Sequence, residues 1–310
     1  MSATIDGFIP ETESVAKPFV KWAGGKGQLL KDIRANYPDG LGNTIRRYAE
    51  PFVGGGAVLF DILNNYKLDE VYISDINSEL INTYTVFRDH PEELIAILKE
   101  FQDDHLKRDD VGRKECFSIK RSRFNELKRT GYVGQEIEMA ALFVYLNKTC
   151  FNGLYRVNAK GEYNVPAGVY KNPMICDESN ILAVSEKLSN VQIVNADYRE
   201  SLSFIDQNTF VYFDPPYRPL TTTASFTAYT KELFNDNNQR DLAEYVKQLT
   251  DLGAKVMVSN SDPKNADEND DFFDDLYDGN QILRITANRM INSNAEKRGK
   301  INELLITNFV

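Results

Sequence analysis

The sequence predicts an α/β domain built on a mostly parallel sheet and interrupted by an inserted, mainly helical module. Short apolar runs rich in β-branched and aromatic residues recur along the chain and are joined by helical stretches, as in parallel sheets. Residues 77–147 show helical periodicity, which indicates the insertion. The chain has 310 residues and no internal repeat, enough for one large core or two modest ones.

The first elements can be assigned in chain order. Residues 1–16 have no periodicity, and we expect a flexible leader there. Residues 48–63 run from an apolar approach through three glycines into an apolar stretch, which predicts a strand, a glycine turn and a helix start. Residues 71–75 alternate in polarity, so we expect a short strand with Asp75 at its tip.

The later elements follow the helical segment. Residues 155–165 contain two short strand-like runs around a glycine, which predicts a β-hairpin. Parallel strands are predicted at 191–194, 209–213 and 255–259, and a closing antiparallel pair at 283–286 and 304–307.

Composition excludes several classes of protein. The longest apolar stretches are far shorter than the ~20 residues of a membrane-spanning helix. Three scattered cysteines do not make a disulfide framework or a zinc cluster, so we expect no metal and a reducing, cytoplasmic location. The two histidines lie in the helical segment, and we expect them to be structural or surface residues.

Charge is distributed unevenly. The net charge of −10 argues against a polyanionic partner. Residues 106–131 nevertheless carry nine Lys/Arg against four Asp/Glu, and residues 284–300 carry five against one. An acidic run at 262–278 balances them. Each run alone is equally consistent with a solvated face, so charge does not decide the function.

Three predicted strand ends converge on one candidate site. The strand at 209–213 stops at Asp214-Pro215-Pro216-Tyr217, where the prolines end the ladder. A second strand ends at Asp75 and a third leads into Gly54-Gly55-Gly56. Open α/β sheets bind ligands beyond the carboxyl ends of their strands, and a carboxylate 19 residues after a glycine turn suits a ribose. A nucleoside-containing ligand is therefore predicted.

Five sequence blocks, taken in order, resemble the N6-adenine-specific DNA methyltransferases of the Dam type (D12 class, alpha group), close to the GATC adenine methylases of restriction-modification systems. The resemblance covers nearly the whole chain. The blocks are Lys17–Lys26, Glu50–Gly56, Ser74–Asn77, Phe151–Arg156 and Asp214–Tyr217. The resemblance implies a Rossmann-like sheet with helices on both faces that binds S-adenosylmethionine, and methyl transfer to adenine in duplex DNA, with 5′-GATC-3′ as the target.

The resemblance also assigns roles to individual residues. It implies that an adenine flipped out of the duplex gives hydrogen bonds to Asp214 and the Pro215 carbonyl, while Tyr217 stacks on the base. The implied catalytic residues are Asp214, Pro215, Pro216 and Tyr217. The implied S-adenosylmethionine contacts are Trp22, Lys26, Phe52, Gly54, Gly55, Asp75 and Asp214.

Target recognition is expected in the insert and the hairpin. Arg156 resembles the family's guanine-reading arginine, and Phe151 with Asn152 matches its aromatic-Asn pair, with Phe where some members have Tyr. Basic residues of the insert and of the C-terminal part are candidates for phosphate contacts. These candidates are Lys148, Arg121, Arg123, Arg289, Lys297, Arg298 and Lys300.

The resulting organisation is a leader at 1–16, a catalytic and cofactor-binding domain at 17–88 and 186–310, and a target-recognition domain at 89–185. A monomer, or at most a weak dimer, is expected, with no membrane association. Three other classes remain as alternatives. They are a protein-glutamine methyltransferase, which usually has Asn at the position of Asp214, a non-catalytic DNA-binding regulator, and a nicotinamide-dependent dehydrogenase, whose glycine spacing is incomplete here.

Overall fold

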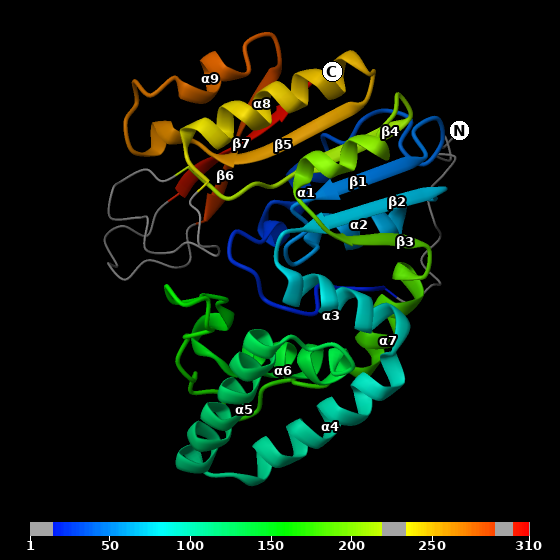
Figure 1. The fold of residues 1–310 in the computed structure, drawn as a ribbon. Coiled ribbons are helices and arrows are strands. Elements are labelled where there is room, and N and C mark those ends of the chain that lie inside the picture. The colour runs from blue at the N-terminus through cyan, green and yellow to red at the C-terminus, as the bar shows by residue number, and fades with distance from the viewer. Residues whose placement is uncertain (1–14, 219–233, 289–299, 310) are drawn as a thin grey trace, which may run out of the picture.

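The computed structural model describes residues 15–218, 234–288 and 300–309, and its centre is a seven-stranded sheet (Figure 1). The strand order is β3-β2-β1-β4-β5-β7-β6. The first five strands in this order are parallel, and β7 runs antiparallel to both β5 and β6. The α/β class and the closing antiparallel pair are therefore confirmed. The strands are β1 (Arg47–Pro51), β2 (Glu70–Asp75), β3 (Val191–Asn195), β4 (Thr209–Phe213), β5 (Lys255–Ser261), β6 (Gln281–Asn288) and β7 (Lys300–Thr307).

Helices cover both faces of the sheet because the buried strands are apolar on both sides. Successive side chains alternate between faces, so Tyr48 and Ile73 pack in one apolar cluster and Ala49 and Tyr72 in another. The first face is covered by α1 (Leu30–Arg34), α2 (Ala57–Asn65), α3 (Ser78–Asp89) and α7 (Glu178–Leu188). The second is covered by η3 (Tyr198–Ser203), α8 (Asp236–Asp251) and α9 (Phe272–Leu276).

The helical insertion predicted at 77–147 begins later than expected, because α3 at its start packs on the sheet. The insert consists of α4 (Pro91–Lys107), α5 (Asp110–Thr130) and α6 (Glu136–Thr149), which lie beyond α3, on the opposite side of the sheet from α8 and α9 (Figure 1). Residues 139–147 of α6 are all buried, and residues 139–146 belong to the same apolar cluster as the first sheet face. The insert therefore shares its core with the sheet.

The structure places one predicted domain boundary inside an element. Helix α7 is a single unit from residue 178 to 188 that packs against α3 and α2, so a boundary at 186 cuts it. The other boundary, between residues 88 and 89, falls at the last residue of α3. The leader also differs from the expectation at its end. Ala16 is buried, and its backbone exchanges hydrogen bonds with the side chain of Asn64.

The hairpin predicted at 155–165 is reduced to a single bridge between Val157 and Tyr163. The backbone groups of Tyr163 point away from Val157 and pair with a side chain of α5: Asn125 accepts from the Tyr163 N–H at 2.8 Å and donates to the Tyr163 carbonyl at 3.0 Å. In the register of this bridge Leu154 faces Pro166, which has no N–H with which to extend the ladder. The segment still turns back on itself, through a hydrogen bond from the Asn164 N–H to the Arg156 carbonyl.

The described residues contain no helix long and apolar enough to cross a membrane. The three cysteines are buried and unpaired, as expected for packing residues. His105 is buried between the Tyr145 hydroxyl and the Tyr170 carbonyl, and His90 lies at the surface beside Glu93. Both histidines are the structural or surface residues that the sequence predicts.

Candidate active site

Strands β1 and β4 are neighbours at the centre of the sheet, and they mark the point where the strand order reverses. From β1 the chain continues outward through β2 and β3, and from β4 it continues outward on the other side through β5. The carboxyl ends of neighbouring parallel strands meet at one edge, and such a reversal point is where open α/β sheets bind ligands. The predicted convergence of the glycine turn, Asp75 and Asp214 is therefore confirmed.

The turn after β1 has a constrained backbone. Phe52 adopts φ 97°, and Gly54 and Gly56 also lie in the left-handed region. The Phe52 N–H donates to the Ser74 carbonyl at 2.9 Å, and the Gly54 carbonyl accepts from the Tyr84 hydroxyl at 3.0 Å. These contacts hold a conformation that a non-glycine residue such as Phe52 rarely adopts.

The glycines of this turn are required by Trp22. A Cβ at Gly54 would lie 2.8 Å from the Trp22 ring, and one at Gly55 would lie 3.0 Å from the Trp22 Cβ. Trp22 also stacks on Tyr155, with ring centroids 5.7 Å apart, and on Phe143 at 6.4 Å. The tryptophan therefore lies between the glycine turn and the insert.

Asp75 is tied to the same turn by backbone donors. Its carboxylate accepts from the Gly54 N–H at 3.2 Å and from the Asn77 N–H at 2.9 Å. Burial raises the pKa of Asp75, and the backbone N–H groups oppose that rise. The next side chain, Ile76, is 54% exposed and offers an apolar surface beside the carboxylate. Ile76 was not among the residues predicted from the sequence.

The Asp214 carboxylate is paired with a buried lysine. Lys26, the first residue of η1 (Lys26–Gln28), donates to Asp214 Oδ1 at 2.6 Å, to the Tyr217 hydroxyl at 2.8 Å and to the Gly24 carbonyl at 2.8 Å. Only 2% of the Lys26 side chain is exposed, so the carboxylate balances a cation that is removed from water. Burial raises the pKa of Asp214, Lys26 opposes the rise, and Glu303 adds to it.

The two prolines after Asp214 differ in their surroundings. Pro215 is buried and Pro216 is exposed. The Pro216 carbonyl accepts from the Gln239 side chain at 3.2 Å, and Gln239 is in turn held by Asn260. In the described part of the chain no donor is paired with the Pro215 carbonyl. The tetrapeptide therefore presents a carboxylate, a carbonyl and the Tyr217 ring from one rigid segment.

Two further carboxylates contribute to the site and were not predicted as site residues. Glu303 of β7 accepts from the Tyr217 hydroxyl at 2.8 Å. Glu50 of β1 is buried, accepts from the Tyr48 hydroxyl at 2.7 Å, and its pKa is raised to about 8, mainly by burial. Glu50 lies inside one of the sequence blocks, but Glu303 has no local signal except a carboxylate within an apolar strand.

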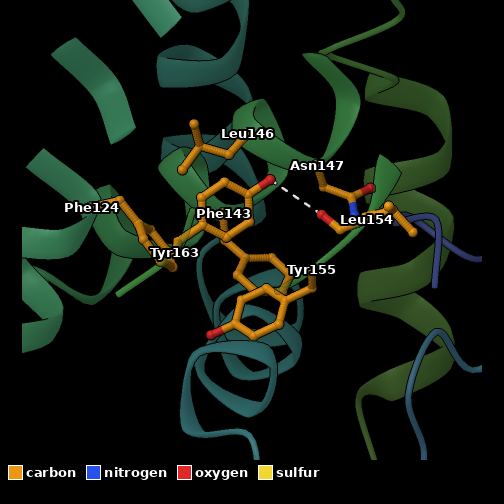
Figure 2. Close-up of a pocket in the computed structure, with 7 residues that line it drawn as sticks. All are labelled: Phe124, Phe143, Leu146, Asn147, Leu154, Tyr155 and Tyr163. Carbon is orange, nitrogen blue, oxygen red and sulfur yellow. Dashed lines mark hydrogen bonds between the residues drawn. The ribbon is translucent and has the colours of Figure 1, made fainter. Parts of the chain in front are cut away.

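Aromatic side chains fill the centre of the insert, beneath the segment that carries Arg156. Tyr163 donates to the Leu154 carbonyl at 3.2 Å, the dashed line in Figure 2. Tyr155 packs against Phe143 and Tyr163 in the same view. Asn147 of α6 is buried, pairs with both backbone groups of Lys21 and donates to the Gly153 carbonyl. One side chain thus joins α6, the segment before Trp22 and the predicted recognition turn.

The structure exposes the residues predicted to read the DNA sequence. Phe151 is 53% exposed at the start of η2 (Phe151–Gly153), and Asn152 is exposed with φ 56°. Arg156 is exposed, and its Nε donates to the Asn164 side chain at 2.8 Å. One terminal nitrogen, Nη2, also donates to the Asn164 carbonyl at 3.4 Å, so Asn164 holds the guanidinium at two points. The three predicted residues lie on one short segment.

The residues predicted to contact phosphates differ in their exposure and in their partners. Arg123 makes two hydrogen bonds to Glu138, both 2.8 Å, and one to Glu126, so its role here is structural. Arg121 is half-buried and donates to the Val165 carbonyl, and Lys148 is half-buried with its pKa lowered by burial. Arg289, Lys297 and Arg298 lie outside the described residues, and Lys300 is the first residue of β7.

Several basic residues of the run at 106–131 form ion pairs with acidic side chains. Lys128 pairs with Glu79 at 2.7 Å, Arg108 with Asp104 and Arg129 with Glu162. In the second basic run, Arg284 pairs with the buried Asp262. Some partners lie close in sequence, such as Asp110 for Arg113, whereas others, such as Glu79 for Lys128, come from distant elements and could not be predicted from the run itself.

Residues 22–291 match the family described as D12 class N6 adenine-specific DNA methyltransferase. The chain belongs to this family. It is 49% identical over 296 residues to the Type II methyltransferase M.MjaIII of Methanocaldococcus jannaschii, an alignment covering 94% of this chain and 99% of that protein. It is 39% identical to the Type II methyltransferase M1.LlaDCHI of Lactococcus lactis subsp. cremoris (94% and 95% covered) and 34% identical to a DNA adenine methylase of Vibrio cholerae (93% and 95%).

This adenine-specific DNA methyltransferase uses S-adenosylmethionine as its methyl donor, and the site fits that cofactor. The turn at Gly54 and Gly55 has no Cβ atoms, so a ligand can approach its backbone closely. Asp75 supplies carboxylate oxygens suited to ribose hydroxyls, and Ile76 supplies an apolar contact beside them. The described residues contain no group of three or more His, Cys, Asp or Glu side chains arranged to hold a metal ion.

Proposed function

We propose that this methyltransferase modifies the adenine of 5′-GATC-3′ in duplex DNA, and that the adenine leaves the helix to reach Asp214. The observation that carries the proposal is the rigid tetrapeptide at the end of β4, whose carboxylate is held by Lys26 at 2.6 Å beside the cofactor turn. The insert with Arg156 borders this site through Trp22 and Tyr155.

The reaction needs positioning more than acid-base chemistry. The lone pair of the adenine N6 is delocalised into the ring, so the amine is a poor nucleophile until its hydrogens are held out of the ring plane. Asp214 and the Pro215 carbonyl accept those hydrogens, and the carboxylate stabilises the positive charge that grows on nitrogen. When bound, S-adenosylmethionine would supply the sulfonium methyl group and would leave as the neutral thioether, and the proton that N6 loses would pass to solvent water.

Base flipping follows from where the acceptors lie. Asp214 is only partly accessible, with 21% of its side chain exposed, so an amine inside a base pair does not reach it. Extruding the base costs a few kcal/mol in lost stacking and pairing. Stacking on the Tyr217 ring and hydrogen bonds to the tetrapeptide offset that cost. Phe151 and Asn152 are exposed on the insert. In this proposal they fill the space in the duplex that the extruded adenine leaves.

Sequence reading is assigned to Arg156. An arginine can give two hydrogen bonds to O6 and N7 of guanine, a contact worth about 1–3 kcal/mol of discrimination. The hydrogen bond from Nε to Asn164 holds the guanidinium for such a contact. Arg121 and Lys148 are weaker candidates for phosphate contacts, because both are half-buried. Arg289, Lys297 and Arg298 remain candidates on the sequence alone.

The biological setting is proposed from the relatives. Two of them are named Type II methyltransferases, which suggests that this chain protects DNA as part of a restriction-modification system in the cytoplasm. We propose that it acts as a monomer. The division into a catalytic domain (17–88 and 186–310) and a recognition domain (89–185) is part of the same proposal, with the second boundary moved before α7.

Transfer of a labelled methyl group from S-adenosylmethionine to matched duplexes tests the proposal. One duplex contains GATC and the others have a single base of that site changed. Label on N6 of the GATC adenine alone supports both the reaction and the target. Equal label on all the duplexes contradicts the target assigned through Arg156, and label on a duplex whose adenine cannot leave the helix, because it is cross-linked in its pair, contradicts base flipping.

A further inference from the structure

Glu303 contacts the active site although it is distant in sequence from every motif. It lies in β7 and pairs in register with Ser261 of β5 and Ile285 of β6. Because β7 runs antiparallel to β5, its first residues reach the sheet edge at which the parallel strands end. The Glu303 side chain is 13% exposed, and it meets Tyr217 there.

The hydrogen bonds around Tyr217 have one consistent direction. A tyrosine hydroxyl has one proton, and Tyr217 gives it to Glu303 Oε2 at 2.8 Å. The Tyr217 oxygen accepts from Lys26 Nζ at 2.8 Å. Lys26 has three protons, and the other two go to Asp214 and to the Gly24 carbonyl. Glu303 is therefore the terminal acceptor of a chain that begins at Lys26.

Loss of this acceptor would affect the ring that faces the substrate. Without Glu303, the hydroxyl proton of Tyr217 has no partner among these residues, and a buried unpaired hydroxyl is costly enough to make the side chain reorient. The Tyr217 ring would then leave the position that the hydroxyl now fixes. The Pro215-Pro216 segment restrains the backbone of Tyr217 but not its side-chain torsions.

We propose that Glu303 is a positioning residue for methyl transfer, holding the Tyr217 ring through its hydroxyl in the orientation that receives the target adenine. The inference rests on the proposed roles of Asp214 and Tyr217. It assigns to the closing antiparallel pair of the sheet a part in the reaction, in addition to its part in the fold.

Three substitutions of Glu303 separate the hydrogen bond from the charge. Glu303→Gln keeps an oxygen that accepts from Tyr217 and removes the charge. Glu303→Asp keeps the charge and draws the carboxylate back by about 1.5 Å, one carbon-carbon bond. Glu303→Ala removes both. We expect kcat to stay within about threefold of wild type for Gln and to fall about tenfold to a hundredfold for Asp and Ala.

The substrate-binding constants should change much less than kcat, because contacts to the DNA backbone supply most of the affinity for the duplex. We expect the KM for DNA and the Kd for S-adenosylmethionine to stay within about twofold. Tyr217→Phe keeps the ring and removes the hydroxyl, so adding Glu303→Ala to it should lower kcat by less than about threefold further. Glu70→Ala is the matched control, an exposed strand glutamate paired with Arg47 at 3.3 Å, and it should leave kcat unchanged.

The possible results are distinct. If wild type is active and Glu303→Ala is equally active, this inference alone is overturned. It is also overturned if Glu303→Ala lowers kcat by the same factor in wild type and in Tyr217→Phe. An inactive Gln variant beside an active Asp variant also overturns it, because the charge would then matter and the hydrogen bond would not. A wild type that methylates no duplex overturns the proposed function, and this inference with it.

Discussion

At the end of β4, Asp214 has two separable properties, its charge and its ability to accept hydrogen bonds. Asp214→Asn keeps an oxygen for Lys26 but loses the charge that stabilises the reacting amine. We expect methyl transfer to fall about a hundredfold or more, a loss typical of removing one electrostatic group from an active site. Labelled methyl transfer at saturating DNA measures it. The Tm should change little, because Glu303 lies 3.9 Å from Lys26 and still balances its charge. A folded variant with the wild-type rate would contradict the catalytic role.

Glu50 makes stability depend on pH. Its pKa is about 8 in the folded protein, and its ordinary value is 4.5. Between pH 4.5 and pH 8 the carboxyl group is therefore protonated in the folded state and ionised in the unfolded state. The contribution of this group is therefore complete below pH 4.5 and is lost as the pH rises toward 8, by at most about 1.4 kcal/mol per pH unit.

Glu50→Gln tests this assignment, because an amide does not titrate. We expect the free energy of unfolding of the variant to exceed that of wild type at pH 8 and to lie closer to it at pH 5. Urea unfolding at both pH values measures this. Asp69→Asn is a control at an exposed site. Parallel pH dependences for wild type and Glu50→Gln would show that Glu50 is ionised in the folded protein.

Individual site residues could be predicted from the sequence where a reactive side chain directly follows a recognisable strand. Asp75 and Asp214 could be predicted because each follows a strand directly. Glu303 could not, because its partner Tyr217 is 86 residues away and the contact depends on the direction of β7. The pairing of Arg123 with Glu138 was equally hidden, since it joins two helices.

Among the elements, the turn that carries Arg156 is held by side chains rather than by a strand ladder. Arg156→Ala should reduce discrimination at one guanine of the target by about 1–3 kcal/mol while weakening affinity for non-cognate DNA much less. Competition binding with duplexes changed at each guanine measures this. Arg129→Ala, an exposed arginine of the same module that pairs with Glu162, should weaken all duplexes about equally or not at all. An equal loss for cognate and non-cognate DNA from Arg156→Ala would make it a phosphate contact.

A buried ion pair connects α3 to α5 and to the recognition segment. Glu79 is 4% exposed, pairs with Lys128 at 2.7 Å, and accepts from the Tyr155 hydroxyl at 3.0 Å. Glu79→Ala leaves Lys128 without its partner, so we expect a loss of about 3 kcal/mol in the free energy of unfolding, the lower part of the range for breaking a buried pair. Urea unfolding checks it. Glu178→Ala, which breaks an exposed pair with Lys99, should cost under about 1 kcal/mol, and equal costs would contradict the argument.

The elements themselves were predicted well where one periodicity dominated. The strands from β2 to β5 are short runs rich in β-branched and aromatic residues, and residues of the insert repeat apolar side chains at helical spacing. The predicted hairpin forms with a single bridge, between Val157 and Tyr163, because Pro166 lies opposite Leu154 in that register and has no N–H to extend the ladder. The predicted boundary at 186 falls inside α7, which is one continuous helix from residue 178 to 188.

Across the whole molecule, the insert and the sheet face form one apolar core. We therefore expect a single cooperative unfolding transition, with the calorimetric enthalpy equal to the van't Hoff enthalpy. Differential scanning calorimetry, with far-UV circular dichroism as a second probe, measures both. Two resolved transitions, one of them matching the helical insert, would show that the two parts fold independently. The two domains were predicted from the order of the motifs along the chain. The shared core depends on contacts between α3 and α6, which that order does not reveal.

Trp22 is the only tryptophan in the chain, and it stands between the turn at Gly54 and the ring of Tyr155. Its indole emission therefore reports on one junction and is not averaged over several sites. Ligands arriving from either side, cofactor at the turn or DNA at the insert, should each change that emission, and the two changes can be titrated separately without any attached dye. The molecule thus has an intrinsic fluorophore at the contact through which its two substrates would influence one another.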